Sequence, residues 1–272
     1  MIDGALPYLR CPVCRQHLRR DDKRLLCTRG HSFDMAKQGY ADLTAGRMPH
    51  VGDTAEMVAD REAFLAAGHY DFIADALPGT DGLVVDAGTG TGFYLGKVLQ
   101  KAPAATGLGL DVSKPALRRA ARAHPRAAAV LADLWRPLPI ADGAAAMVLN
   151  VFAPRNGAEY RRILRPGGAL VVVTPAADHL GELMRGLIRV DPDKAERVGD
   201  ALGEHFTAGP AVTERRTLRL SAAEARTLIG MTPAARHVPP GDRPTGDVTV
   251  TAAVEITTYT ERSTSSHSAG LS

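Results

Sequence analysis

The chain contains little of what marks an exported or membrane-spanning protein. Only three of its 272 residues are cysteine, and none of them lies after residue 27. A small, odd number of thiols argues against a disulfide framework and is typical of a reducing compartment. No stretch approaches the roughly 18 consecutive apolar residues of a membrane helix, and the first ten residues lack the apolar core of a signal peptide. We therefore expect a cytoplasmic protein with no membrane segment.

An excess of charge of one sign is also missing. Thirty-three Lys and Arg residues against 30 Asp and Glu leave a net charge of +3, which is small for a general nucleic-acid-binding protein. The excess is local, because residues 1–50 contain nine basic and five acidic residues while the other 222 contain 24 and 25. The basic segment is the one that contains the cysteines. It suits contact with a polyanion, although a solvated surface loop would have the same composition.

The three cysteines and one histidine have the spacing of a zinc site. Cys11 and Cys14 are two residues apart, twelve residues follow, and Cys27 and His31 are three residues apart. Two tight turns of this kind present four ligands, which complete a tetrahedral shell for Zn²⁺ and leave no open position. We therefore predict a structural zinc ion. The alternatives are unrelated buried thiols or a redox Cys-x2-Cys pair, but the usual βαβ setting of such a pair is absent.

The sequence divides into four segments. Residues 1–46 form the predicted zinc-binding module, and 47–78 a linker with helices. Residues 79–260 form an α/β domain, and 261–272 a polar tail that we expect to be disordered. In the α/β domain short apolar runs alternate with helix-like stretches, which predicts a parallel sheet with right-handed crossovers.

The expected elements follow from these patterns. Buried strands are predicted at 83–88, 106–112, 128–133, 145–152 and 169–175, with a turn at 165–168 before the last. Helical spacing is found at 54–77, with a division at Gly68, and again at 179–190. Residues 213–230 indicate a strand followed by a helix, and 247–259 an antiparallel strand.

A glycine-rich turn follows the first of these strands. Asp86, Gly88, Gly90 and Gly92 lie where the strand leads into a helix, so backbone can pass close to a ligand and helix N–H groups can face it. A G-x-G-x-G pattern alone is shared by dinucleotide enzymes and methyltransferases. Residue 93 is Phe, however, so the G-x-G-x-x-G pattern of NAD sites is absent.

Two further acids favour one of these cofactors. Asp111 ends the second strand, where its carboxylate can accept hydrogen bonds from a ribose, and Asp133 closes the third, where it can accept from an adenine amino group. Acids at three successive strand ends fit S-adenosylmethionine better than NAD. We therefore expect a class I, Rossmann-like S-adenosylmethionine methyltransferase domain behind a small zinc-binding domain.

Several stretches together resemble the bacterial 23S ribosomal RNA guanine-N1 methyltransferases, a family that includes macrolide-resistance enzymes of actinomycetes. The stretches are CPVC…C…GHSFDMAKQGYADL (11–43), GDTAEMVADREAFLAAGHY (52–70), VVDAGTGTGFY (84–94), GLDVSK (109–114), the FAP within NVFAPRN (150–156) and RPGGALVVVTPAADHL (165–180). The zinc spacing with its downstream motifs is far more specific than the glycine turn. The likeness extends to about residue 260.

The resemblance implies roles for particular residues. It implies zinc ligation by Cys11, Cys14, Cys27 and His31, and adenosylmethionine contacts at Tyr70, Gly90, Thr91 and His179. It also implies a guanine in a hairpin loop of 23S rRNA near the peptide exit tunnel as substrate, resistance to macrolides of the tylosin and mycinamicin type, and a possible homodimer. Thr91 stands where relatives carry an acidic residue, but backbone groups do much of the binding at such a turn.

Residues for the transfer step are harder to find in the sequence. Asn150 ends the fourth strand, where class I methyltransferases often contact the target base, and Phe152 and Arg155 could stack on the base or anchor it. Strand packing and a surface loop would explain the same three residues. Guanine N1 carries a proton whose removal makes it a better nucleophile, yet no carboxylate identifies itself as the base.

Two other functions remain open from the sequence. A small-molecule methyltransferase could use zinc only to stabilise its fold, but it has no need of a basic module. A non-catalytic RNA-binding factor could retain the fold, but it has no need of Asp86, Gly88, Gly90 and Asp111. The basic residues of the module suit a phosphate backbone around an unpaired loop; they are Arg15, Arg19, Arg20, Lys23, Arg24 and Arg29.

Overall fold

The computed structural model describes residues 2–46, 48–184, 202–232, 238, 241 and 243–262. Its strands are β1 (Leu18–Asp21), β2 (Arg24–Cys27), β3 (Ser32–Asp34), β4 (Ala41–Asp42), β5 (Gly82–Ala87), β6 (Ala105–Asp111), β7 (Ala127–Leu131), β8 (Ala145–Val151), β9 (Leu164–Pro175), β10 (Phe206–Leu220) and β11 (Val248–Glu261). Its helices are α1 (Ile2–Ala5), α2 (Ala55–Ala66), α3 (Asp71–Ala76), α4 (Phe93–Lys101), α5 (Lys114–Ala123), α6 (Gly157–Ile163), α7 (Gly181–Met184) and α9 (Ala222–Gly230), and a 3-10 turn, η1, spans Leu6–Tyr8.

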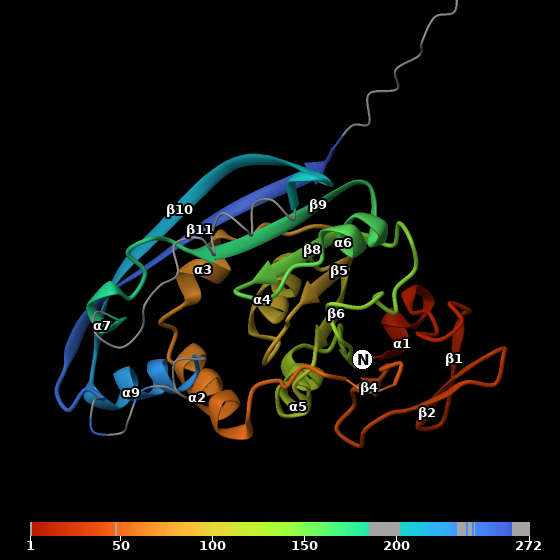
Figure 1. The fold of residues 1–272 in the computed structure, drawn as a ribbon, viewed down its shortest axis with the longest axis horizontal. Helices are drawn as coiled ribbons and strands as arrows, with labels where there is room; N and C mark the ends of the chain where they lie inside the picture. The colour runs from red at the N-terminus through yellow and green to blue at the C-terminus, as the bar shows by residue number, and fades with distance from the viewer. Residues whose placement is uncertain are drawn as a thin grey trace, which may run out of the picture.

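An eight-stranded sheet runs through the molecule in the order β10-β11-β9-β8-β5-β6-β7-β4 (Figure 1). The strands from β4 to β9 pair in parallel, whereas β11 is antiparallel to both β9 and β10. A separate sheet of β1, β2 and β3 lies at the far end from the antiparallel pair β10–β11. The predicted α/β class with a parallel sheet is therefore confirmed.

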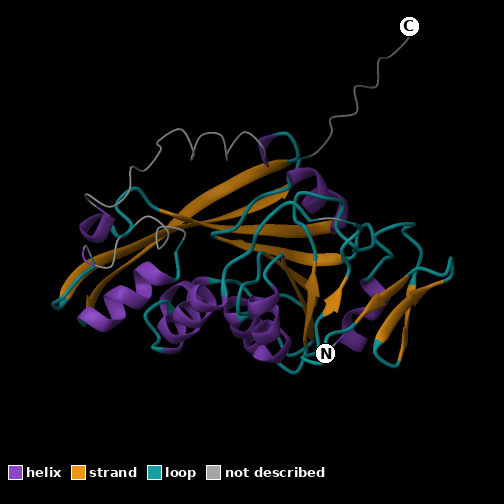
Figure 2. Ribbon diagram, turned by 60° about the horizontal axis from the view of Figure 1, so that its bottom comes forward, coloured by secondary structure: helices purple, strands orange, loops and turns teal. Residues whose placement is uncertain are grey.

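Different helices and segments cover the two faces of the large sheet. Alternate residues of β5 separate the faces: Leu83 and Val85 belong to one apolar cluster and Val84 to another, as expected of a parallel strand buried on both sides. The face of Val84 packs against α2, α3, α4 and α9, and Figure 2 shows helices gathered along one side of the sheet. The face of Leu83 packs against α1, α6 and the cysteine-bearing segment.

The cysteine-bearing segment is continuous with the core of the larger domain. Leu25 and Phe33 of the small sheet share one apolar cluster with Leu138 and Ile140, which precede β8. The short strand β4 leaves the small sheet altogether and extends the large sheet beside β7. The boundary at residue 46 stays a prediction, but residues on both sides of it contribute to the same sheet.

Most of the expected elements form, and four differ. Helix α2 begins after Thr54, whose hydroxyl accepts a hydrogen bond from Met57 N–H at 3.3 Å, and Gly68 at φ +81° separates α2 from α3 as expected. The predicted turn at 165–168 lies inside β9, where a register shift against β8 absorbs it.

The three other differences are at the C-terminal side. Strand β10 begins at Phe206, before the expected start at 213, because pairing with β11 extends it. Glu261, placed in the disordered tail, ends β11 instead, while 263–272 lie outside the described residues. Of the helix expected at 179–190, α7 covers 181–184, and 185–190 lie outside the described residues. Within the described residues no helix is long and apolar enough to span a membrane.

Candidate functional site: a zinc centre and a cofactor edge

The four predicted zinc ligands lie together at the base of the small sheet. One ligand atom from each of them can be chosen so that all four lie within 4.8 Å of one another. The closest pairs are Cys27 Sγ and His31 Nδ1 at 3.2 Å, Cys11 Sγ and His31 Nδ1 at 3.6 Å, and Cys14 Sγ and Cys27 Sγ at 3.7 Å. These separations are close to the edges of a tetrahedron with metal–ligand bonds of roughly 2.0–2.3 Å. The donor set therefore fits a structural Zn²⁺.

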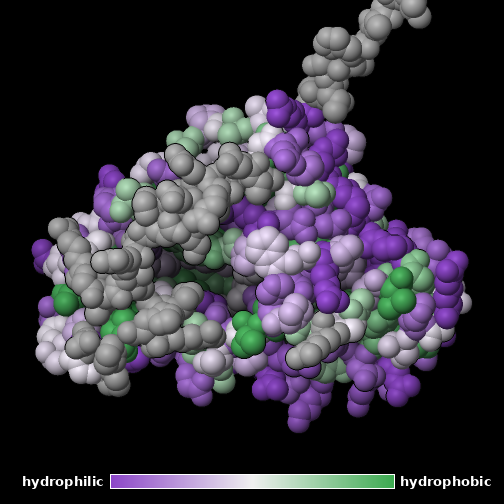
Figure 3. All heavy atoms as spheres, viewed as in Figure 1, coloured by the Kyte–Doolittle hydropathy of each residue, from purple (hydrophilic) through white to green (hydrophobic). Residues whose placement is uncertain are grey.

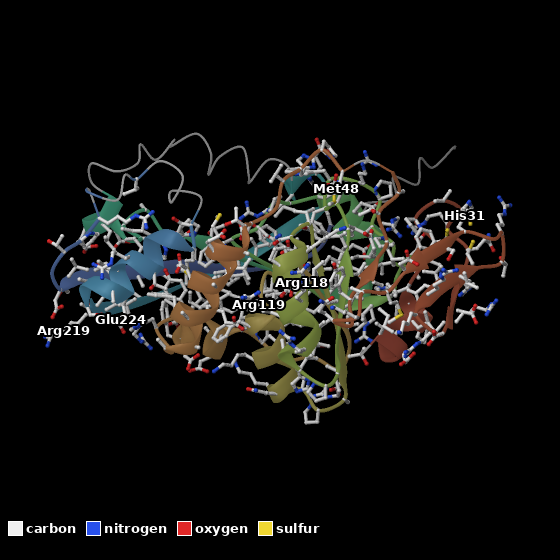
Figure 4. All side chains as sticks on the ribbon, turned by 90° about the horizontal axis from the view of Figure 1, so that it is seen from below. His31, Met48, Arg118, Arg119, Arg219 and Glu224 are labelled. Atoms are coloured by element: carbon white, nitrogen blue, oxygen red, sulfur yellow. The ribbon has the colours of Figure 1, made fainter. Side chains whose placement is uncertain are left out.

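Two backbone turns hold these ligands. Arg15 N–H donates to Cys11 carbonyl at 2.8 Å, and Gly30 N–H donates to Cys27 carbonyl at 3.0 Å. Arg15 and Gly30 both adopt positive φ, at +64° and +83°, which closes each turn sharply. Figure 4 shows His31 at the end of the molecule that the small sheet forms. The ligands therefore come from local chain geometry.

The charge state of the cysteines also suits a metal. Burial acts to raise the pKa of the Cys27 thiol, but hydrogen bonds from the backbone of His31 and Arg29 and from the His31 ring outweigh it and bring that pKa to about 6. A thiolate is the form of cysteine that binds zinc. Burial raises the pKa of Cys11, the more enclosed of the two.

Arg15 also attaches the zinc centre to the large domain. Its guanidinium donates to the carbonyls of Leu138 and Ile140 at 2.6 and 2.7 Å. Next to it, Arg10 N–H donates to Pro139 carbonyl at 2.9 Å. Of the six basic residues expected to face RNA, Arg15 is thus half-buried and engaged within the protein. The others, Arg19, Arg20, Lys23, Arg24 and Arg29, are exposed.

The predicted cofactor residues meet at the carboxyl ends of the parallel strands. We call the turn 86–92 together with Tyr70, Asp111, Asp133 and His179 the cofactor cradle. Figure 3 shows a hollow with apolar residues at its floor, next to α3 and the end of β8 as drawn in Figure 1. In open α/β sheets, ligands bind at this edge of the strands.

The three glycines of the turn have three different surroundings. A Cβ on Gly88 would collide with Ala153, and a Cβ on Gly92 would lie 2.8 Å from Ala123 Cβ, so both glycines serve close packing. A Cβ on Gly90 would meet only the Arg61 side chain within 4 Å among the described atoms. Backbone at Gly90 is therefore open to a ligand, which is what a cofactor passing over the turn requires.

Two acids shape the turn from below. Asp111 accepts hydrogen bonds from the N–H groups of Gly90 and Ser113, both at 2.8 Å, and burial raises its pKa. Asp86 is fully buried and accepts from Thr89 hydroxyl at 2.7 Å. Burial, with a smaller contribution from Asp111, raises the pKa of Asp86 to about 7. Thr91 is buried within the same turn.

Asp133 is engaged by the linker that precedes α2. His50 Nδ1 lies 3.1 Å from one of its carboxylate oxygens, and Trp135 N–H donates to the other at 3.0 Å. Trp135, the only tryptophan of the chain, is 56% exposed beside this pair. The acid predicted to meet an adenine amino group therefore lies at the rim of the cradle with a partner from another segment.

Tyr70 and His179 lie close together, as the resemblance implies. Ala253 N–H donates to His179 Nδ1 at 3.1 Å, which leaves the other ring nitrogen facing the Tyr70 hydroxyl at 3.5 Å. Burial lowers the pKa of His179 and raises that of Tyr70. Phe152, 43% exposed and at φ +54°, has its ring 5.9 Å from that of His179. This part of the cradle is uncharged and partly aromatic.

The structure separates the three residues predicted for the transfer step. Phe152 lies at the mouth of the cradle. Asn150 is fully buried, and its amide donates to the carbonyls of Ala87 and Pro154 at 3.2 and 2.9 Å, so it holds the loop after β8. Burial lowers the pKa of Arg155, and the hydroxyls of Tyr259 and Tyr160 counteract it. A base-contacting role for Asn150 and Arg155 stays a prediction.

Sequence reasoning missed two residues of this edge. His50 lies in the segment regarded as linker, and Arg61 lies on the polar side of a predicted helix. Arg61 has no local signal, because helical spacing marks a charged residue as solvent-facing, and His50 has none because it stands alone in a segment without periodicity. The stretch GDTAEMVADREAFLAAGHY (52–70), which resembles the family as a block, includes Arg61 but not His50.

The comparisons with known proteins match both parts of the site. Residues 9–45 match the family model of the zinc ribbon described as "RlmA, N-terminal", and residues 84–168 match a model described as "Methyltransferase domain". We use zinc ribbon below for residues 9–45. The first match contains the zinc ligands, and the second contains the glycine turn of the cradle.

Three curated relatives cover nearly the whole chain. The "Putative 23S rRNA (guanine-N(1)-)-methyltransferase" of Micromonospora griseorubida is 54% identical over 95% of this chain and 99% of its own. The "23S rRNA (guanine(748)-N(1))-methyltransferase" of Streptomyces fradiae is 49% identical over 89% and 90%, and a Bacillus subtilis protein, YxjB, is 32% identical over 85% and 87%. The chain therefore belongs to the family of 23S rRNA (guanine-N1)-methyltransferases, with a structural zinc ribbon and an S-adenosylmethionine-dependent methyltransferase domain.

Proposed function

We propose that this chain transfers a methyl group from S-adenosylmethionine to N1 of a guanine in a hairpin loop of 23S rRNA near the peptide exit tunnel. Relatives at 54% and 49% identity over nearly their full length are named for guanine-N1 methylation of that RNA. The guanine numbered 748 in the name of the Streptomyces fradiae relative is the first position to examine. A methyl group there would confer resistance to macrolides of the tylosin and mycinamicin type.

The observation that carries this proposal is the exposed basic hairpin of the zinc ribbon. Arg19 and Arg20 on β1, Lys23 at the turn and Arg24 on β2 are all exposed. The acidic partners of three of these arginines, Asp3, Asp21 and Asp34, are exposed as well. Exposed ion pairs of this kind contribute little free energy, so phosphates can replace the acids at small cost. A metabolite-specific enzyme has no use for such a surface.

One chain segment, residues 132–144, contacts both the ribbon and the cradle. Residues 132–144 contain Asp133 at their start and, at Leu138 and Ile140, the carbonyls that Arg15 binds. An RNA loop held by the ribbon would thus lie beside the chain segment that shapes the cofactor rim. N1 lies on the Watson–Crick edge of guanine, so the target base must be unpaired or extruded.

The roles of the chain's own residues follow from their positions. Bound S-adenosylmethionine supplies an electrophilic methyl group on its sulfonium. Asp111 and the Gly90 backbone would hold it, and Phe152 would stack on the target base at the mouth of the cradle. Correct placement of guanine N1 supplies much of the catalysis in such a transfer. Burial lowers the pKa of His179, which favours its neutral ring beside the methyl donor.

The test is methylation of defined RNA. Purified protein is incubated with labelled S-adenosylmethionine and unmodified 23S rRNA, and the modified nucleotide is mapped by reverse-transcription stops, because a methyl on N1 blocks base pairing. We expect one stop at a hairpin-loop guanine. Label on another atom or nucleotide, or no label on RNA, would contradict the proposal. Growth of a susceptible strain that expresses the protein, with and without tylosin, tests resistance.

A charge-removal series tests the basic hairpin. Replacing Arg19, Arg20 and Lys23 with Ala should weaken rRNA binding at least tenfold while leaving S-adenosylmethionine affinity unchanged, because the three residues lie on the ribbon. A control replaces Arg118 and Arg122, two exposed arginines of α5; Figure 4 shows Arg118 away from His31, which marks the ribbon end of the molecule. Equal losses in both variants would mean that net charge alone matters.

We further propose that the protein acts in the cytoplasm and as a homodimer, in which two ribbons form one RNA cleft. The support is the family resemblance and the need to grip a loop from more than one side. Light scattering of the purified protein measures the oligomeric state directly, and a monomer at micromolar concentration would contradict the dimer.

A further inference from the structure

Arg61 borders the open side of the glycine turn. A Cβ placed on Gly90 would lie 3.5 Å from Arg61 Nη1 and 3.7 Å from Arg61 Cδ, with no other described atom within 4 Å. Gly88 and Gly92, by contrast, face packed alanines of the protein. The guanidinium of α2 therefore lies beside the space through which a cofactor crosses the turn.

The guanidinium is held in place from two sides. Nη1 forms an ion pair with Asp53, and Nη2 donates to Met231 carbonyl at 2.8 Å. Asp53 is fixed in turn, because its carbonyl accepts a hydrogen bond from Ser113 hydroxyl at 2.8 Å. Arginine has five N–H donors, and these two contacts use two of them within the described part of the chain. The side chain is thus rigidly placed and still able to bind a ligand.

The acidic residues around the turn can match the cationic groups of the cofactor, but its carboxylate needs a positively charged partner. S-adenosylmethionine has a cationic sulfonium, an ammonium and one carboxylate. Asp86 and Asp111 are suited to its hydroxyl and cationic groups. A carboxylate there would be repelled by these acids unless a cation faced it, and arginine is the side chain that binds carboxylates in a planar, two-point geometry.

Tyr94 supplies a second polar group on the same side. Its hydroxyl is buried with no hydrogen-bond partner among the described residues, and it interacts electrostatically with Arg61 and Tyr70. A buried hydroxyl without a hydrogen-bond partner is energetically costly in a folded protein, which indicates that a bound ligand supplies the partner. The orphaned hydroxyl and the guanidinium therefore both point to an acceptor group that arrives with the cofactor.

We propose that Arg61 binds the α-carboxylate of the methionyl part of S-adenosylmethionine, with Asp53 holding its guanidinium in position. The inference rests on the cofactor and not on which nucleotide is methylated. It is therefore tested by binding alone, without RNA, and a failure of the RNA proposal leaves it intact.

The test compares two ligands that differ in the carboxylate. Calorimetry measures the affinity of S-adenosylmethionine and of its decarboxylated form for the wild type and for Arg61→Met. In the wild type we expect the carboxylate to improve binding at least tenfold. In Arg61→Met that preference should fall to about threefold or less, while the affinity for the decarboxylated ligand changes less than threefold.

Arg119→Met is the matched control. Arg119 is also a half-buried arginine in an ion pair at the α2–α5 contact, with Glu62 at 2.8 Å, but no contact places it at the turn. It should keep the wild-type preference for the carboxylate. Equal weakening of both ligands in Arg61→Met would overturn the proposal, because it would show that Arg61 supports the fold only. An unchanged preference would overturn it as well.

A second variant guards against misfolding. Arg61→Lys keeps the positive charge and loses the two-point geometry, so its carboxylate preference should lie between those of the wild type and Arg61→Met. The preference is a ratio measured within one protein, and a general loss of folded molecules lowers both affinities equally. A preference in Arg61→Lys equal to that of the wild type would contradict the two-point contact.

Discussion

The zinc centre and the cofactor cradle are built in opposite ways. All four zinc ligands lie within residues 11–31, and two tight turns bring them together. The cradle collects residues from Tyr70 to His179, and its strand-end members meet only because parallel strands end at one edge of the sheet. The first site is local and depends on spacing, whereas the second depends on the whole fold. The two sites should therefore respond differently to perturbation.

Zinc removal should have the largest effect. Because Leu25 and Phe33 of the ribbon share an apolar cluster with Leu138 and Ile140, we expect loss of the metal to destabilise the entire chain. Structural zinc contributes about 10 kcal/mol or more in small modules, so Cys14→Ser or a strong chelator should lower Tm by more than about 10 °C. The measurements are metal content and thermal unfolding. An unchanged main transition would show that the ribbon folds separately.

A smaller but still large effect is expected at the glycine turn. Gly92→Ala places a Cβ 2.8 Å from Ala123 Cβ and 2.9 Å from Ala120 Cα at φ +80°. Overpacking and the left-handed backbone together should cost about 2–4 kcal/mol. Gly143 is the control, because it has φ +61° but no atom of the described residues within 4 Å of its added Cβ, so Gly143→Ala should cost about 1 kcal/mol. Urea unfolding measures both, and equal costs would contradict the packing role.

The buried acid should make stability depend on pH. The pKa of Asp86 is about 7 in the folded state against an ordinary 3.8, so ionising it opposes folding. Its contribution is fully favourable below 3.8 and is lost as pH rises toward 7. Relative to Asp86→Asn, the wild type should lose about 2 kcal/mol between pH 5.5 and 7 and little above that, at about 1.4 kcal/mol per unit. Parallel stability curves for the two proteins would contradict this.

The weakest predicted effect concerns the joint between ribbon and domain. Arg15→Met removes the two hydrogen bonds to Leu138 and Ile140 carbonyls and should cost about 1–2 kcal/mol. Arg19→Met, on the exposed hairpin of the same ribbon, should change the free energy of unfolding by less than about 0.5 kcal/mol. If Arg19→Met destabilised the protein as much as Arg15→Met, the hydrogen bonds between ribbon and domain would not explain the loss of stability.

The sequence predictions succeeded for features set by local spacing and failed for features set by the whole fold. Strands β5 to β9 were predictable because each is a short apolar run, and the zinc ligands because their spacing matches known ligand patterns. The start of β10 was not, because pairing with β11 extends it beyond its local signal. Strand β4 could not be assigned to the large sheet for the same reason. Residues 165–168 lie within β9 at a register shift, between the β8 pairings of Leu164 and Ala169.

Among site residues, local signal and tertiary position gave different results. Gly88, Gly90 and Gly92 form one motif in the sequence, yet only Gly90 is open to a ligand. Asn150 ends its strand as predicted, and its amide nitrogen holds the following loop, while its amide oxygen is buried without a hydrogen-bond partner among the described residues. Arg15 was predicted to contact RNA because it is a basic residue of the zinc ribbon. Its guanidinium instead binds carbonyl groups of the larger domain and connects the two parts.

The amino-acid sequence by itself determined the zinc shell, the alternation of strands and helices, and the acids at three strand ends, since each depends on spacing over a few residues. Only the tertiary structure decided that the ribbon shares its core with one face of the sheet and that Arg61 lies over the glycine turn. These depend on which side chains meet across the fold. Side-chain packing between distant segments is set by the summed burial of the whole core, and no short stretch contains that information.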